Sequence, residues 1–211
     1  MVNSASIKIA MLKVKYIIFR YLTSADFFNI YKPSGTEESG GGQAYIDFPT
    51  NAISIDEWGK FFDGAPSVYC DTGEQGPSWE FPINSIGQNE NQEIKIYQRR
   101  PQSICIASQR ITSQRENRIH AWKPEFGFPQ PSDPKERNTV PDNLLIFLVR
   151  ATNDEFWAGW ALTHKPGNSS EANSRIEKML KNSIGEGYAG FLELNGKLGL
   201  DTQNSIHPFI M

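Results

Sequence analysis

Residues 144–150 read LLIFLVR, and residues 156–162 read FWAGWAL. Both runs are apolar and rich in branched and aromatic side chains, which is typical of buried β-strands. Asn153 and Asp154 lie between the two runs, and these residue types favour a tight turn. We therefore predict that the two runs pair with each other and form the core of the fold.

Shorter strands are predicted on both sides of this pair. Alternating or β-branched apolar residues place them at residues 16–22, 44–48, 93–98 and 103–108. The last two strands are separated by Arg99-Arg100-Pro101, which resembles a turn or a bulge. Asn195-Gly196 predicts a final hairpin within residues 191–200. The strands outnumber the helices, so the sequence predicts a mainly β fold.

Three short helices are also predicted. Ser54 and Glu57 form a capping box at the start of one helix, which we expect to end at Gly64. Its apolar face would consist of Ile55, Trp58, Phe61 and Phe62. The other two helices are expected at residues 4–12 and 169–184. The chain length suits one domain over residues 1–211, with a core of about residues 13–190.

The composition argues against several classes of protein. Cys70 and Cys105 are too few for a disulfide framework, which fits a reducing cytoplasm. Four basic residues interrupt the apolar stretch of residues 7–22, so neither a signal peptide nor a membrane span is predicted. The three histidines lack the spacing of metal ligands, and no cofactor motif is present. We expect no cofactor, no metal and no membrane association.

The charge distribution is uneven along the chain. Residues 99–123 contain six arginines or lysines and one acid, which gives this window a charge of +5 within a chain of net charge −3. A local basic stripe of this kind is typical of a surface that contacts nucleic acid. The competing interpretation is a solvated charged loop.

Two segments without periodicity, which we call arms, are the candidate binding elements. The first arm covers about residues 24–43 and contains Gly40-Gly41-Gly42, whose backbone can approach a partner closely. The second arm covers about residues 108–127 and contains Arg115-Glu116-Asn117-Arg118. Arginine reads guanine, asparagine reads adenine and a carboxylate accepts from cytosine, so this run has the donors and acceptors of base readout.

The order of these features resembles the N-terminal effector domain of EcoRII-type restriction endonucleases. The resemblance is carried by the strand ending at residues 19–26, the glycine run into Gly41-Gly42-Gln43, the strand ending Phe48-Pro49, and residues 115–119 followed by Trp122. That family has an open, seven-stranded-type DNA-binding pseudobarrel, shared with plant B-three transcription factors. The chain departs from the family at Gly42 and Asp47, where a histidine and a tyrosine are expected.

The resemblance implies that both arms enter the major groove of double-stranded DNA and read a CCWGG-like half-site. Base contacts are then expected from Gln114, Arg115, Glu116, Asn117 and Arg118. First-arm contacts are expected from Lys32, Ser34, Ser39, Gly41, Gly42 and Gln43. Phosphate contacts are expected from Arg99, Arg100, Arg110, Thr112, Ser113 and Lys123. The chain itself would not be an enzyme but a bacterial, cytoplasmic recognition domain covalently linked to a nuclease domain.

Two alternatives remain open at the level of sequence. Glu93 and Lys95 could form half of a magnesium-dependent nuclease site, with Asp71, Glu74 or Glu80 as the other half. Alternatively, a β-barrel could bind a small ligand or a protein, which would require an apolar pocket.

Overall fold

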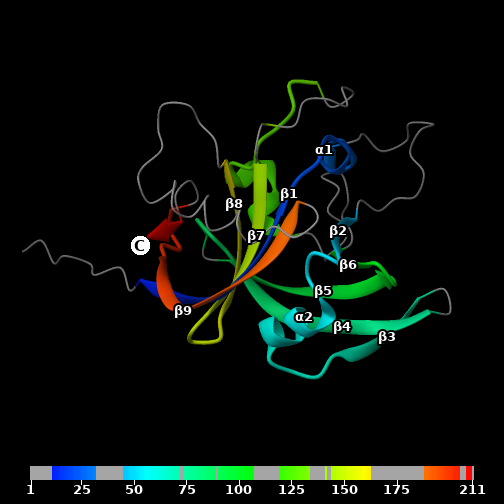
Figure 1. Cartoon of the computed structure of the whole chain (residues 1–211). Coiled ribbons are helices and arrows are strands. Elements are labelled where there is room, and N and C mark those ends of the chain that lie inside the picture. The colour runs from blue at the N-terminus through cyan, green and yellow to red at the C-terminus, as the bar shows by residue number, and fades with distance from the viewer. Residues whose placement is uncertain are drawn as a thin grey trace, which may run out of the picture.

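The computed structural model describes residues 11–31, 45–71, 74–88, 90–106, 119–133, 141, 144–162, 188–204 and 208–210. These residues form a ten-stranded sheet, two α-helices and two short 3-10 helices (Figure 1). The strands are β1 (Leu12–Tyr21), β2 (Ile46–Pro49), β3 (Ser67–Asp71), β4 (Glu74–Ser85), β5 (Asn91–Arg100), β6 (Ser103–Ile106), β7 (Leu144–Ala151), β8 (Phe156–Leu162), β9 (Ala189–Leu200) and β10 (Phe209–Ile210). The helices are α1 (Ser24–Tyr31), α2 (Ile55–Phe62), η1 (His120–Trp122) and η2 (Pro124–Phe126). The prediction of a mainly β fold with short helices is confirmed.

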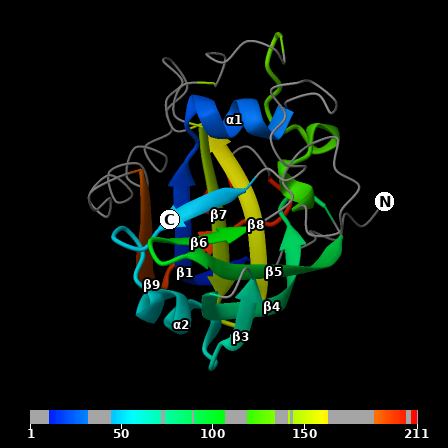
Figure 2. The same cartoon turned by 90° about the vertical axis from the view of Figure 1, so that its right-hand side faces the viewer.

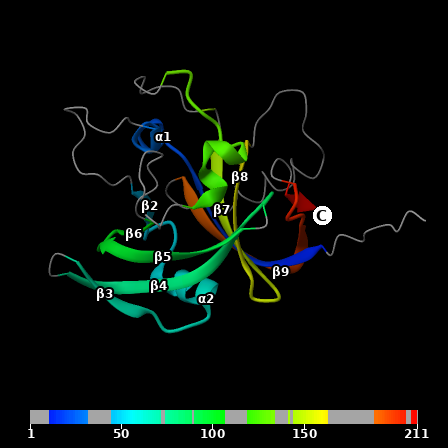
Figure 3. The ribbon, with the colours of Figure 1, turned by 180° about the vertical axis from the view of Figure 1, so that it is seen from behind.

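The strands follow the order β10-β9-β1-β7-β8-β4-β5-β6-β2, and β3 pairs with β4. All ladders are antiparallel except the short parallel one between β4 and β8. Among the described strands no ladder joins β10 to β2, so the sheet stays open, as predicted. Figures 1 and 3 show that β7 and β8 run across the direction of β4 and β5, and Figure 2 shows β5 crossing β1, β7 and β8. The sheet is therefore folded over, with its two halves packed crosswise.

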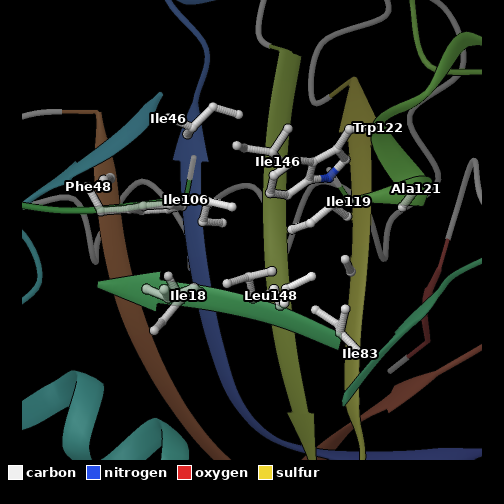
Figure 4. Packing of buried hydrophobic residues seen from close by; sticks show 14 of the residues in the cluster. Ile18, Ile46, Phe48, Ile83, Ile106, Ile119, Ala121, Trp122, Ile146 and Leu148 are labelled. Carbon is white, nitrogen blue, oxygen red and sulfur yellow. The ribbon is translucent and has the colours of Figure 1, made fainter. Parts of the chain in front are cut away.

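The main core lies between these two halves. Ile18 of β1 and Leu148 of β7 point toward Phe48 of β2 and Ile106 of β6 (Figure 4). These four side chains are fully buried. Branched side chains on two facing strands interdigitate well across a sheet interface. The core thus fixes how the β2–β6 edge sits on β1 and β7.

Strand β7 is buried on both faces, which explains its uninterrupted apolar sequence. Ile146 and Leu148 belong to the main core, whereas Phe147 and Val149 belong to a second core on the other face. β7 pairs with β8 through the predicted turn, in which Asp154 has a φ of 65°. The prediction that these two strands pair within the core is confirmed.

Helix α2 begins with the predicted capping box. The Ser54 hydroxyl accepts from the Glu57 backbone amide at 3.2 Å, and the Glu57 carboxylate accepts from the Ser54 amide at 2.7 Å. Two details of the prediction were wrong. The helix ends at Phe62 with Asp63, not Gly64, next to it in the left-handed conformation, and Ile55 is 41% exposed.

The first arm was predicted to lack periodic structure over about residues 24–43, which was wrong for α1. Thr23 and Asp26 cap this helix reciprocally: the Thr23 amide donates to the Asp26 carboxylate at 2.9 Å, and the Asp26 amide donates to the Thr23 hydroxyl at 3.2 Å. An aspartate here replaces the glutamate or glutamine of the usual capping box. Residues 109–127 were likewise predicted as a loop, but η1 and η2 lie within them.

The predicted hairpin at Asn195-Gly196 was also wrong. Both halves of β9 pair with β1, where Val14 lies opposite Leu198 and Tyr16 opposite Glu193. Asn195 and Gly196 do adopt positive φ values of 48° and 79°. They lie in an irregular bulge, in which residues 194–197 of β9 are opposite Lys15 alone, because positive φ angles can accommodate extra residues in a strand as well as close a turn.

The other predicted elements agree less completely. β1 begins at Leu12 instead of residue 16, so the end of the helix predicted at 4–12 is strand; residues 4–10 lie outside the described residues. The helix predicted at 169–184 also lies outside them. β5 and β6 pair with a register shift between Gln98 and Arg100, which confirms the predicted turn or bulge.

Candidate functional site

Only three of the predicted DNA-contacting residues belong to the described part of the chain. They are Arg99, Arg100 and Lys123. The five base-reading candidates at 114–118, the six first-arm candidates, and Arg110, Thr112 and Ser113 lie outside the described residues. The described part of the candidate site therefore consists of the residues that flank the two arm segments, 32–44 and 107–118.

The two arm segments adjoin the sheet at neighbouring points. Ile46, shortly after the first segment, pairs with Ile106, which directly precedes the second segment. Strands β2 and β6 lie side by side in Figure 2. Paired antiparallel strands lie about 4.8 Å apart. One end of each segment is thus attached to the same corner of the sheet.

The other flanks of the two segments also belong to one packed region. Tyr31, the last residue of α1, donates a hydrogen bond from its hydroxyl to the backbone oxygen of Pro129. The rings of Phe27 and Phe128 are 6.5 Å apart, centroid to centroid. Trp122 is buried and donates from Nε1 to the Gly159 oxygen at 2.9 Å. Helix α1 therefore packs against the residues that follow the second segment, and these residues are anchored to β8 through Trp122.

Arg20 of β1 contacts residues on both flanks of the first arm segment. Its side chain is 3% exposed and forms an ion pair of 2.6 Å with Asp26 of α1. It also donates to the backbone oxygen of Asp47 in β2, and its guanidinium lies 4.8 Å from the ring centroid of Tyr188. In the sequence, Asp26 precedes residues 32–44 and Asp47 follows them. One buried cation thus contacts both flanks of that segment.

Asp47 is also bound through its side chain. Its Oδ2 accepts from Nη2 of Arg99 at 2.9 Å, and the Arg99 guanidinium lies 4.1 Å from the ring centroid of Tyr45. Burial disfavours the charged form of Arg99, but the hydrogen bond and charge of Asp47 outweigh burial and raise the Arg99 pKa above its ordinary value. Arg99 is therefore a fixed cation.

Cys105 lies beside this pair and is fully buried. Burial, followed by the charge of Asp47, raises the pKa of the thiol to about 12. The thiol is thus protonated at neutral pH, and the thiolate is the nucleophilic form. Cys105 is a packing residue of the small cluster that it forms with Tyr97 and Tyr45.

The three described basic candidates fall into two places. Arg99 and Arg100 are adjacent on β5, and Arg100 is exposed at the end of the strand, where it pairs with Ser103. Lys123 lies between η1 and η2 and is half-buried. The structure therefore brings Arg99 and Arg100 beside β6 and places Lys123 with the helical turns that follow residues 107–118.

The residues of the nuclease alternative lie on β4 and β5. Glu80 pairs with Lys95 across the ladder, and their side chains form an ion pair of 2.6 Å. Glu93 lies opposite Pro82 and is exposed. In the described part of the chain no three histidine, cysteine, aspartate or glutamate side chains are grouped to hold a metal ion.

A hollow of about 260 Å³ lies between the end of α2 and β4. Its walls include Phe62, Trp79, Phe81 and Phe156. These rings pack on one another, with Phe62 and Phe81 centroids 4.5 Å apart. Ligand sites in proteins usually measure about 300–1,000 Å³. The hollow lies below that range, and Figure 1 shows α2 at the opposite end of the fold from α1.

No protein-family model matches the chain, and no curated protein matches it in sequence. Within the described residues, no helix is both long enough and apolar enough to cross a membrane.

The sequence did not predict the roles of Arg20, Asp26 and Asp47. The Thr23 and Asp26 spacing is a detectable capping signal, but the contact of Arg20 with both flanks of one segment depends on tertiary packing.

Proposed function

We propose that this chain binds double-stranded DNA sequence-specifically, with both arms in the major groove, as a target-recognition module similar to the EcoRII-type effector domains. It would act in the bacterial cytoplasm and work with a separate nuclease domain, the cleavage activity lying outside this module.

The observation that carries the proposal is the pairing of Ile46 with Ile106. The major groove is about 12 Å wide, so two arms can share one groove only if they start close together. Neighbouring strands provide a starting distance of about 5 Å. A recognition surface assembled from two segments far apart in sequence needs this proximity.

Charge gives the second support. Arg100 is exposed on β5 beside β6, and the basic window of the sequence continues from it through the second arm. Basic groups that neutralise phosphates position a protein on DNA, whereas base contacts provide the sequence preference. The chain contains both kinds of residue in one window.

A binding-site selection on random duplexes tests the proposal. We expect one short motif to be enriched, bound in the absence of Mg²⁺ and left uncut in its presence. The proposal would be contradicted if the selection enriched no motif. It would also be contradicted if the chain bound selected and scrambled duplexes equally well at one salt concentration. Cutting that is lost in Glu93→Ala would favour the nuclease alternative.

A further inference from the structure

Arg99 and Arg100 are adjacent in sequence but differ in their surroundings. The Arg99 side chain is 21% exposed, is ion-paired with Asp47 and is stacked on Tyr45. Arg100 is exposed, and no ion pair joins it to a described residue. The sequence predicts the same role, phosphate binding, for both residues. Among the described residues, however, Arg99 is held by an ion pair, whereas Arg100 is exposed and has no ion pair.

The Arg99–Asp47 pair is poorly suited to bind a phosphate. The carboxylate offsets the charge of the guanidinium, and the affinity gained from counterion release depends on cationic charge that phosphates can use. Arg99 Nε and Asp47 Oδ1 are buried, and no described residue forms a hydrogen bond with either atom. Pulling Arg99 toward a phosphate would also leave the Asp47 carboxylate unpaired, which is costly for a partly buried charge.

The same contacts are well placed to hold the first arm. Tyr45 and Asp47 are among the first described residues after the segment 32–44. They precede or belong to β2, a strand of four residues at the edge of the sheet whose described ladder is with β6 alone. Arg99 of β5 forms an ion pair with Asp47 and stacks on Tyr45. Arg20 of β1 donates a hydrogen bond to the Asp47 backbone oxygen.

We propose that Arg99 is a positioning residue for the first arm, acting through Asp47 and Tyr45, and that Arg100 is a phosphate contact. The inference rests on the proposed function. It gives the two neighbouring arginines different roles: Arg99 determines how well the chain distinguishes its target, and Arg100 determines how strongly it holds any duplex.

Four variants separate these roles: Arg99→Ala, Arg99→Lys, Asp47→Asn and, as the matched control, Arg100→Ala. Affinity is measured for each on the selected and a scrambled duplex over a range of salt concentrations. Arg100→Ala should weaken binding to both duplexes alike and reduce the magnitude of the log-log salt slope by about 0.9. Arg99→Ala should keep the slope, whereas Asp47→Asn should keep or steepen it, because the guanidinium loses the carboxylate that offsets its charge. Both variants should lose about tenfold of the preference for the selected duplex.

Arg99→Lys is the sharpest of these variants. It keeps the charge and so preserves a phosphate contact, but it lacks the planar fork that pairs with a carboxylate and stacks on a ring. The inference predicts reduced preference with an unchanged slope. Because a loss of folding lowers the amount of active protein without changing the ratio of the two affinities, that ratio remains a valid readout for every variant.

The outcomes distinguish the inference from the proposed function. Wild-type protein without a preferred duplex overturns both. A wild-type preference that Arg99→Lys and Asp47→Asn retain in full overturns the inference alone. A slope that Arg99→Ala reduces as much as Arg100→Ala, with preference retained, makes Arg99 a phosphate contact and also overturns the inference.

Discussion

Ile46 and Ile106 are register partners across the β2–β6 ladder, although 59 residues separate them in the sequence. Both are buried in the main core, where they contact the strands that form the centre of the sheet. The attachment points of the two arm segments are therefore held together by the hydrophobic core itself. Recognition by two arms would then depend on the stability of the fold at this corner.

DNA binding should weaken steeply as salt concentration rises. Each phosphate neutralised by a basic group releases counterions, so about five contacts, from the basic residues of the window other than Arg99, predict a log-log slope of roughly −4.5. Affinities measured between low and moderate salt would give this slope. A flat response would exclude the predicted phosphate contacts.

Two glycines provide a matched test of the packing between β7 and β8. A Cβ added at Gly159 would lie 2.6 Å from a Phe147 ring carbon, so Gly159→Ala should lower the free energy of unfolding by about 1–3 kcal/mol. Gly59, in α2, has nothing within 4 Å of an added Cβ, so Gly59→Ala should stabilise the chain by about 0.5–1 kcal/mol. Denaturant unfolding measures both. If both substitutions changed the free energy of unfolding equally, the close packing of Gly159 against Phe147 would be contradicted.

Removal of Arg20 should destabilise the chain. Arg20→Ala leaves the Asp26 carboxylate, whose side chain is 13% exposed, without its cation. Breaking such a pair costs about 3 kcal/mol, the lower end of the usual range, because Thr23 still donates to Asp26. Arg100→Ala is the exposed control, with an expected change below about 0.5 kcal/mol. A loss for Arg20→Ala as small as that of the control would exclude the ion pair as the support of α1.

The raised pKa of Cys105 predicts that the folded chain loses stability at high pH. Its folded pKa of about 12 lies above the ordinary value of 9.0, so the folded chain retains a proton that the unfolded chain releases. The resulting stabilisation is complete below pH 9 and is lost as the pH rises toward 12. The stability advantage over Cys105→Ala should therefore shrink across that window, as thermal unfolding at several pH values would show.

A labelling experiment checks the same residue independently. In a Cys70→Ser background, a thiol reagent at pH 8 should react with Cys105 only after denaturation, because the thiol is fully buried and protonated. Rapid labelling of the native chain would contradict this assignment.

The fold could be predicted where one physical signal was dominant. Residues 144–150 are apolar throughout because β7 is buried on both faces, and that pattern identified the core. β3 and β4 were not predicted, because Gly76, Pro77 and Pro82 give β4 the composition of a loop. Proline is disfavoured within a paired strand, so tertiary packing overrides local propensity in β4.

The candidate site could be predicted in part. The charge window located Arg99 and Arg100, but charge alone did not distinguish a cation held by Asp47 from an exposed one. The contact between Arg99 and Asp47 joins β5 to β2, and its residues are 52 positions apart. No short-range pattern encodes such a pair, because it exists only after the strands have paired.

The central claim, sequence-specific readout by the second arm, is tested most directly by Glu116→Ala. Affinity for the selected and the scrambled duplex is compared at one fixed salt concentration, because affinities at different salt concentrations are not comparable. A carboxylate that accepts from a cytosine amino group predicts weaker binding to the selected duplex, by about 1–3 kcal/mol, with the scrambled duplex bound as well as before or better. Simple electrostatics predicts the opposite sign, because removing a negative charge strengthens contact with phosphates. Weaker binding to the selected duplex alone is the result we predict; tighter binding to both duplexes would contradict the claim and leave the second arm a generic basic surface.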